Sequence, residues 1–466
     1  MEMYGRRVIT TDAVKITDAN IVDELNKAFP THNLNRTEIE YLWDYFRGKQ
    51  PILQRVKTVR PEICNKIVEN RANEIVSFKV GYLCGEPIQY VGRNGNESVS
   101  RGIAELNEMM FSENKATQDK EVVEWQTIAG LAHRMALPDT RGQEDDAPFE
   151  LYTLDPRDTF VVYSSEVGSK PMFAVKYRVD SENKRICSVY SADRFWRIVE
   201  DKIVESKAHA LGMIPIVEYP ANNARLGAFE IVLPMLDAIN NVASNRMDGI
   251  EQFIQSFIKF VNCDIDEEQF KALKEMGAIK VKSIDGSTAD VSIVTQELNQ
   301  MQTQTLVDYL YQTVLTICGM PNRNGGTSTS DTGAAVIMRD GWSLAESRAK
   351  DSELMFKKSE HDVLKLILRI IRDTRGLSDD IYNLKLKNIS LQFTRRNYEN
   401  VQSKAQVLVS MLQQNKIHPR LAFQHSGLFT DPESAYQLSK EYSEEQEKKA
   451  LEMMQNTDGE EDDENV

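Results

Sequence analysis

Residues 229–261 have the sequence FEIVLPMLDAINNVASNRMDGIEQFIQSFIKFV, in which apolar side chains recur every three or four positions. This period predicts one long helix, and its only proline, Pro234, falls in the second turn, where a proline disturbs a helix less than it does in the middle. At about 1.5 Å per residue, the helix would be about 50 Å long. The chain is therefore expected to leave its N-terminal part along one extended element.

A second helical pattern brings the chain back. Apolar residues from Leu298 to Ile317 keep the helical period, and CGMP at 318–321 ends it, because glycine followed by proline stops a helix. Between the two patterns, DEEQFKALKEMG (266–277) predicts a short capped helix, and AIKVKSIDGSTADVSIV (278–294) predicts a hairpin that turns near Asp285. We therefore expect two helices that carry a small module at their tip.

Two helices cannot cover all of the apolar residues that these patterns contain. Phe253, Phe257 and Phe260, together with the neighbouring aliphatic residues, occupy too wide an arc to face a single partner helix. Identical copies arranged head to tail and closed into a ring would cover them, and so would the N-terminal domain of an ordinary monomer. Geometry alone favours neither arrangement.

The N-terminal part predicts helices followed by strands. The segments 36–50 and 61–85 have helical periods, the second opening with proline and closing with glycine, and a helical pattern continues over 102–137. Alternating β-forming residues over 149–220 then predict an antiparallel region, which ends near the loop PANNARLG (220–227). The fold class is therefore α+β, mainly α.

The C-terminal part is also mainly helical. Residues 334–373 predict a long helix that is interrupted near Gly341, and a strand, LKLKNISLQF, follows at 384–393. Further helical patterns predict a C-terminal cluster. The last residues, 456–466, include five consecutive acids and are expected to be a disordered tail.

Composition limits the function. The chain of 466 residues carries 71 acids and 56 bases, a net charge of −15, which argues against a protein that grips nucleic-acid phosphates. No apolar run is long enough to span a membrane and no signal peptide is evident, so we expect a cytosolic protein. Five scattered cysteines, and histidines without ligand spacing, predict no metal site, and we expect no cofactor.

The segment NRNGGTSTSDTG, residues 322–333, contains no apolar side chain. A phosphate-binding enzyme of the NTPase kind would need GxxxxGK[ST] after a strand, but Gly333 is followed by Ala334 and a helix precedes the segment. A hydrolase would need GxSxG at a strand-to-helix turn, whereas Gly326 and Ser328 belong to GxSxS. A phosphate-binding enzyme that uses 322–333 is the alternative function, and we assign no catalytic residue.

Five segments in this order resemble the portal proteins of tailed double-stranded-DNA bacteriophages, of the siphophage type. They cover most of the chain from about 40 to 440: WDYFRGKQPILQR (43–55), NRANEIVSFKVGYLCGEPIQY (70–90), LDPRDTFVVYS (154–164), GMIPIVEYPANNARLGAFEIVLPMLDAINNVASN (212–245) and LQFTRRNYENVQSKAQVLVSMLQQNKIHP (391–419).

The resemblance implies names for the parts. They are an α/β wing (1–228, with a returning helix and strand at 346–395), the first stem helix (229–262), the clip (263–296), the second stem helix (297–320), the tunnel-loop region (321–345), the crown (396–454) and the acidic tail (455–466). The resemblance also implies a ring, a dodecamer in the virion, at the capsid vertex. Double-stranded DNA enters and leaves through it without sequence-specific recognition.

Partners and site residues follow from the same resemblance. The expected partners are a terminase, which hydrolyses ATP in place of this protein, a head-completion or adaptor protein, and the major capsid and scaffolding proteins. The protein would be made in the host cytoplasm and end in the virion, with no membrane contact. The expected sites are the DNA-channel loop (Asn322, Arg323, Asn324, Thr327, Ser328, Thr329, Ser330 and Asp331), the partner-docking clip (Lys271, Lys274, Lys280 and Lys282) and the ring contact in the stem (Phe253, Phe257 and Phe260).

Overall fold

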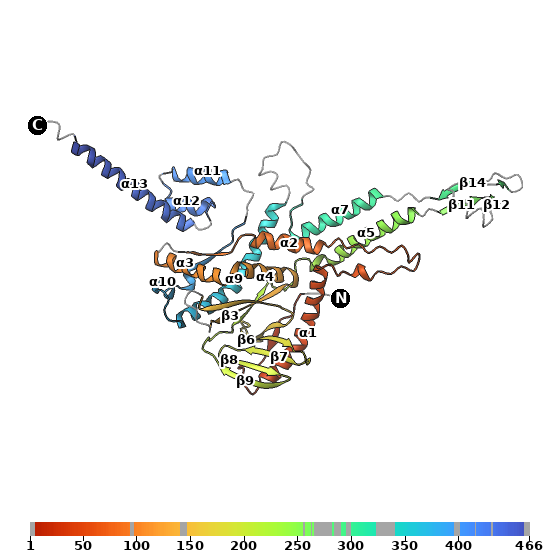
Figure 1. The fold of residues 1–466 in the computed structure, drawn as a ribbon, viewed down its shortest axis with the longest axis horizontal. Helices are drawn as coiled ribbons and strands as arrows, with labels where there is room; N and C mark the ends of the chain where they lie inside the picture. The colour runs from red at the N-terminus through yellow and green to blue at the C-terminus, as the bar shows by residue number, and fades with distance from the viewer. Residues whose placement is uncertain are drawn as a thin grey trace. The chain divides into compact units, whose positions relative to one another are not determined.

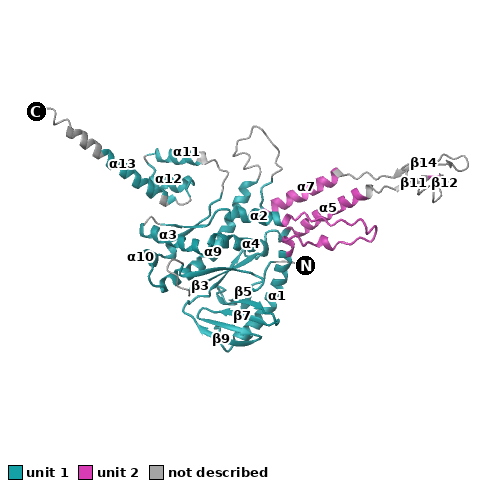
Figure 2. Ribbon diagram, viewed as in Figure 1, with its two compact units in different colours: residues 1–43, 73–231, 319–466 teal, residues 44–72, 232–318 magenta. Residues whose placement is uncertain are grey.

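The computed structural model describes residues 5–93, 97–139, 147–254, 257–261, 263–264, 282–283, 290–294, 300–322, 341–395, 401–414, 416–429 and 432–460. The chain forms two compact units (Figure 2). Unit 1 comprises residues 1–43, 73–231 and 319–466, and unit 2 comprises residues 44–72 and 232–318. Most of the predicted excursion, 229–320, therefore lies in unit 2 as residues 232–318, and a second segment, 44–72, joins it there.

Unit 1 contains a six-stranded sheet that confirms the predicted antiparallel region. Its order is β1 (Ile9–Thr11), β5 (Thr159–Ser164), β6 (Pro171–Val179), β7 (Arg185–Tyr190), β8 (Arg194–Val199) and β9 (Lys202–Ala208). Only β1 and β5 pair in parallel. The helix α1 (Ile21–Phe46) contributes Leu25 and Phe29 to the core of this sheet, where they join Phe160, Phe173 and Trp196.

Unit 1 also contains a second sheet, whose order is β10 (Ile216–Pro220), β3 (Leu131–Pro138) and β4 (Phe149–Leu154). Its strand β3 lies in the range 102–137, for which the sequence predicted helix. Helix α3 (Glu97–Ser112) is followed by α4 (Lys115–Ala129), and α4 ends at Gly130, which has φ 82°. A Cβ at Gly130 would lie 2.0 Å from the carbonyl oxygen of Arg225, so only glycine fits there. The helix prediction for 131–137 is wrong because β3 is central in its sheet and its first six residues are all buried, which removes the alternation that identifies a strand.

The rest of unit 1 is built around α9 (Trp342–Asp373). This helix begins directly after Gly341, at the predicted interruption, and α10 (Asp379–Tyr382) follows it. The strand predicted over 384–393 is shorter than expected: η3 (Leu386–Asn388) comes first, and only β15 (Ile389–Gln392) pairs, with β2 (Gln89–Gly92). The C-terminal cluster consists of α11 (Val401–Leu412), α12 (Pro419–Ser426) and α13 (Pro432–Glu460). Because α13 continues to Glu460, the first part of the predicted tail, 455–466, is helical.

Unit 2 contains the two expected helices, α5 (Leu233–Ile254) and α7 (Gln300–Cys318), which lie side by side (Figure 1). The helix predicted for 229–261 ends early, since η2 (Glu230–Val232) precedes α5 and Phe257–Val261 forms the strand β11. β11 consists of aromatic and β-branched residues with one lysine and pairs with β14 (Asp290–Val294), so strand pairing prevails over the helical period there.

The predicted hairpin at 278–294 is also corrected. Its residues form β13 (Lys282–Ser283) and β14, but these strands pair with β12 (Cys263–Asp264) and β11 of the incoming chain, not with each other. The short helix predicted at 266–277 lies outside the described residues.

The helix predicted over 61–85 is shorter in the structure, because only α2 (Arg71–Cys84) is helical. The segment before it is not helical and lies along α5. We call residues 65–69 the strap. Its alternate backbone N–H groups donate to three side chains of α5: Asn65 to Asp248 (2.7 Å), Ile67 to Ser244 (2.9 Å) and Glu69 to Asn240 (2.9 Å).

We call these three hydrogen bonds the ladder. They can form together because the repeat along the helix and the repeat along the strap have nearly the same length. Four residues of a helix rise about 6.0 Å and two residues of a strand about 6.6 Å, so side chains at i, i+4 and i+8 meet every second N–H of the strap. All three acceptors are buried, which leaves their residues 0–4% exposed. Three backbone N–H groups of the strap therefore have acceptors although the strap belongs to no sheet.

Replacing Ser244 with alanine is expected to leave the partly buried Ile67 N–H without its acceptor, which costs about 1 kcal/mol of unfolding free energy. Denaturant unfolding and hydrogen exchange of the 65–69 peptide measure this. The exposed neighbour Asn241, changed to alanine, is the control and is expected to leave both values unchanged. Wild-type protection of the Ile67 amide in Ser244→Ala would contradict the ladder.

Candidate functional site

The structure describes few of the loop and clip residues named from the sequence. Asn322 is half-buried and is the last described residue before the loop, whereas Arg323–Asp331 lie outside the described residues. In the clip, Lys282 belongs to β13, and Lys271, Lys274 and Lys280 lie outside the described residues.

The three stem phenylalanines do not belong to one helix, as the sequence pattern predicted. Phe253 is in the last turn of α5, whereas Phe257 and Phe260 are in β11, opposite Val294 and Val291 of β14. The prediction of a continuous helical arc across these residues is therefore wrong, because the chain changes from helix to strand after Ile254.

The two ends of the channel-loop segment meet at its base. Gly319 and Gly341 both have left-handed backbones, with φ 65° and 79°. A Cβ built on Gly341 would lie 3.8 Å from Cα of Pro321 and 4.0 Å from the nitrogen of Asn322. A Cβ on Gly319 would lie 2.7 Å from Cγ of Arg348, which is in the second turn of α9. Residues 323–340 therefore leave and return through one narrow base, which we call the loop base (319–322 and 341).

The first turns of α9, directly after the loop base, are held by an aromatic and ionic cluster. The ring of Trp342 lies 6.2 Å from that of Phe78 and 6.0 Å from that of Tyr82, both on α2. The Tyr82 hydroxyl donates to Glu346 at 2.9 Å. Arg395 also donates to Glu346 at 2.9 Å, and it pairs with Glu353 two turns further along α9. The side chains of Arg395 and Glu353 are 9% and 12% exposed, so their ion pair is largely shielded from water, whereas Glu346 is 26% exposed.

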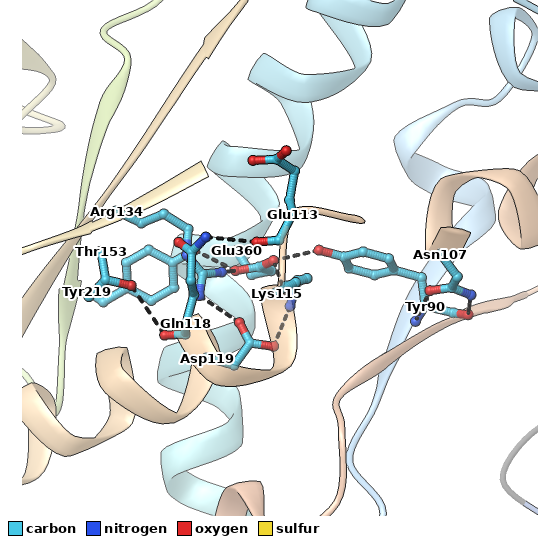
Figure 3. Close-up of polar contacts among 10 residues, drawn as sticks. All are labelled: Tyr90, Asn107, Glu113, Lys115, Gln118, Asp119, Arg134, Thr153, Tyr219 and Glu360. Carbon is cyan, nitrogen blue, oxygen red and sulfur yellow. Dashed lines mark hydrogen bonds and ion pairs between the residues drawn. The ribbon is translucent and has the colours of Figure 1, made fainter. Parts of the chain in front are cut away.

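Further along α9, Glu360 is the centre of a buried charged network (Figure 3). One carboxylate oxygen accepts from the Tyr90 hydroxyl at 2.5 Å, and the other accepts from Arg134 at 2.9 Å and from the Tyr219 hydroxyl. Lys115 lies 3.4 Å from Glu360.

Asp119 is the second carboxylate of the network. It accepts from Lys115 at 2.5 Å and from Arg134 at 2.6 Å, so both cations bridge both acids. The four charged side chains are at most 5% exposed, and their formal charges cancel. The network joins five elements: α4, β2, β3, β10 and α9.

Opposing effects set the protonation states. Burial raises the pKa of Glu360, but Lys115 and Arg134, with the hydrogen bonds from Tyr219 and Tyr90, outweigh it and lower the pKa to about 2. Burial, and then the charge of Glu360, raises the pKa of both tyrosines well above the usual value. Glu360 is therefore ionised and the phenols are neutral donors over the whole physiological range.

The network has no access to a substrate, so its role is to fix α9. Within the described ranges, no group of histidine, cysteine and acidic side chains could hold a metal ion. None of the described helices combines the length and apolar composition of a membrane span. The arrangement as a whole anchors α9, which begins directly after the loop base.

Sequence reasoning missed the network, although one signal was present. Glu360 lies on the apolar face of its helix, four residues after Phe356 and three before Val363, and all three are buried. A carboxylate at such a position needs a buried cation. The partners Arg134 and Lys115 could not have been named, because they come from β3 and the start of α4, which only the fold brings together.

Comparison with known families identifies one match. The family model of phage portal proteins, SPP1 Gp6-like, matches residues 25–450 of the chain. A search of curated proteins returned no match.

Changing Glu360 to glutamine is expected to destabilise unit 1 by about 3–5 kcal/mol at neutral pH, because it leaves buried cations without their full counter-charge. The folded pKa of about 2 lies below the ordinary value of 4.5, so the stabilisation from ionised Glu360 is present above pH 4.5 and is lost as pH falls toward 2. Thermal unfolding of the full chain as a function of pH measures both effects.

The exposed residue Glu166, changed to glutamine, is the control for this experiment. If Glu360→Gln loses as much stability relative to the wild type at pH 2.5 as at pH 7, the charge of Glu360 does not account for the stabilisation.

Proposed function

The chain belongs to the SPP1 Gp6-like family of phage portal proteins, and from this premise we propose that it forms the ring through which the genome is packaged into and ejected from the capsid. The family forms the DNA channel at the phage capsid vertex, and its members are structural proteins rather than enzymes. The proposal adds the closed ring, a dodecamer in the virion, and the docking of a terminase and a head-completion protein.

The loop base is the observation that carries the proposal. A two-helix excursion ends at Gly319, and 18 residues, 323–340, follow before the chain is back at the same point at Gly341; the first part of them, 323–333, has no apolar side chain. Behind this point, Trp342, Glu346 and Glu360 hold α9 to the body of unit 1. Such an arrangement suits a channel, because a loop that touches moving DNA must be held firmly at both of its ends.

The chemistry of the loop suits a non-specific contact. Asn322, Asn324, Thr327, Ser328, Thr329 and Ser330 supply amides and hydroxyls, and Arg323 and Asp331 have opposite charges. Such groups contact the DNA backbone without reading base sequence. Because the chain has a net charge of −15, a ring of copies repels DNA overall, which reduces friction in the bore. These eight residues are the proposed DNA contacts.

A ring also gives the stem phenylalanines Phe253, Phe257 and Phe260 a role as proposed contacts between copies. Negative-stain images of the purified protein test the ring directly, and closed rings with a central hole are expected. A protein that stays monomeric at micromolar concentration in light scattering would overturn the proposal.

Deletion of residues 325–330 is expected to leave ring assembly intact, because shortening a loop changes its closure free energy by only about 0.6 kcal/mol per halving of its length. Capsids built with this variant should contain shorter DNA or lose it. A replacement of the same six residues by alternating glycine and serine keeps the length and is the control. Full-length packaging by the deletion variant, measured as DNA length per particle, would contradict the channel role.

The lysines of the clip region are proposed to dock an acidic surface of the terminase or the head-completion protein. Reversing Lys280 and Lys282 to glutamate should slow association and flatten its salt dependence, because rim charges act mainly on the association rate. Lys170→Glu, at an exposed position of unit 1, is the control. If binding of both partners is unchanged in surface-plasmon measurements at two salt concentrations, the lysines do not dock them.

A further inference from the structure

Residues 53–66 of unit 2 form an irregular hairpin, which we call the finger (Figure 2, magenta). Its two sides are joined by side chains: Arg55 donates to the carbonyl of Asn65 at 3.1 Å, and Lys66 donates to that of Leu53 at 2.9 Å. Ile63 is buried inside it. The finger therefore has a defined structure without regular hydrogen bonding.

The finger is fastened to α5 at one carboxylate. Asp248, whose side chain is 5% exposed, pairs with Arg55 and Lys57 at 3.0 Å each and also accepts from the backbone of Asn65. The strap continues this attachment toward Glu69. The base of the finger is therefore rigid relative to α5.

The tip of the finger exposes apolar side chains. Val56 and Val59 are 83% and 75% exposed, although Ile52 and Ile63 on either side are buried. The finger is also basic, with Arg55, Lys57, Arg60 and Lys66 against one acid, Glu62, in a chain whose net charge is −15. A basic, apolar-tipped element fits a surface that is apolar and lacks cations.

α7 of the same unit offers such a surface. Leu306, Tyr309 and Ile317 fall on one face of the helix and are 48%, 64% and 39% exposed. We call these three residues the α7 stripe. The helix QMQTQTLVDYLYQTVLTIC contains no cation, and its single charge is the exposed acid Asp308.

The finger and the α7 stripe lie on different sides of α5. The strap and finger contact α5 through Asn240, Ser244 and Asp248, whereas Arg246 donates to Gln304 of α7 at 2.6 Å. At about 100° per residue, Arg246 points roughly 160° away from the middle of the strap-facing row. The strap and α7 line one pocket beside α5, but Gln304 points roughly 170° away from the middle of the α7 stripe, so the stripe faces away from α5.

We propose that the finger of one copy packs its valine tip against the α7 stripe of the next copy. Two complementary surfaces on opposite sides of one unit form a head-to-tail contact, which repeats around a ring and closes it. The α7 stripe itself carries no charge, because Asp308 lies roughly 150° around the helix from its middle, on the side where Gln304 donates to it. The inference rests on the proposed ring and names the contact that closes it.

The first test replaces both valines with aspartate, Val56→Asp with Val59→Asp. Because both side chains are exposed in a single copy, the protomer should fold normally by circular dichroism, while assembly measured by light scattering weakens at least tenfold. Val14→Asp, at a position 87% exposed in unit 1, is the control and should assemble as the wild type does. Unchanged ring assembly by the finger variant would overturn the inference.

The second test is a cross-link between Val59→Cys and Tyr309→Cys, in a background with Cys64→Ser. Oxidation should give a ladder of covalent oligomers that ends at the full ring, and neither single cysteine variant should give it. Val14→Cys paired with Tyr309→Cys is the control. Rings seen in negative stain without the Val59–Tyr309 ladder would reject the finger contact and leave the portal function standing, whereas a wild type that forms no ring would reject both.

Discussion

Unit 1 depends on the enclosure of Glu360, Asp119, Arg134 and Lys115 in one neutral network. Moving an ion from water into the protein interior costs several kcal/mol even after relaxation, so each of these charges is tolerable only while its partners are in place. The four residues come from three elements, and the two tyrosines that complete the shell come from two more. Because the network includes Glu360, α9 can hold its position only while the partners of Glu360 are also in place.

That constraint extends along α9 to the loop base. Two turns before Glu360, Glu353 pairs with Arg395, and a further two turns back, Glu346 joins Tyr82 and Arg395. In unit 2 the strap is held to α5 mainly by neutral groups. Side chains at every fourth residue of α5 accept hydrogen bonds from every second N–H of the strap, because the two repeats have nearly the same length. In both units these polar contacts add to the packing of buried apolar residues, while the apolar α7 stripe stays exposed in a single copy.

The sequence predicted the features that follow from local periodicity and from strong stop signals. The antiparallel sheet, the excursion with its return at CGMP, and the start of α9 after Gly341 are of this kind. The errors occur where tertiary contacts override the local pattern: β3 is buried in the middle of its sheet, 65–69 is captured by α5, and Phe257–Val261 pairs with β14. Glu360 had a visible signal in its helix, but its partners are brought together by chain segments more than 200 residues apart.

The contrast between the loop base and the segment 322–333 shows how one chain can combine a constrained support with the proposed contact to DNA. At the base, Gly319 and Gly341 have left-handed backbones, and a side chain at Gly319 would meet Arg348. Any other residue there would be strained by about 1–2 kcal/mol from its backbone alone. The segment 322–333, by contrast, contains no apolar side chain that a core would have to accommodate, and closure depends only weakly on loop length. The structural constraints are therefore concentrated in the two glycines and in the contacts that anchor α9, and they leave the composition of 322–333 open to selection for the proposed contact with DNA.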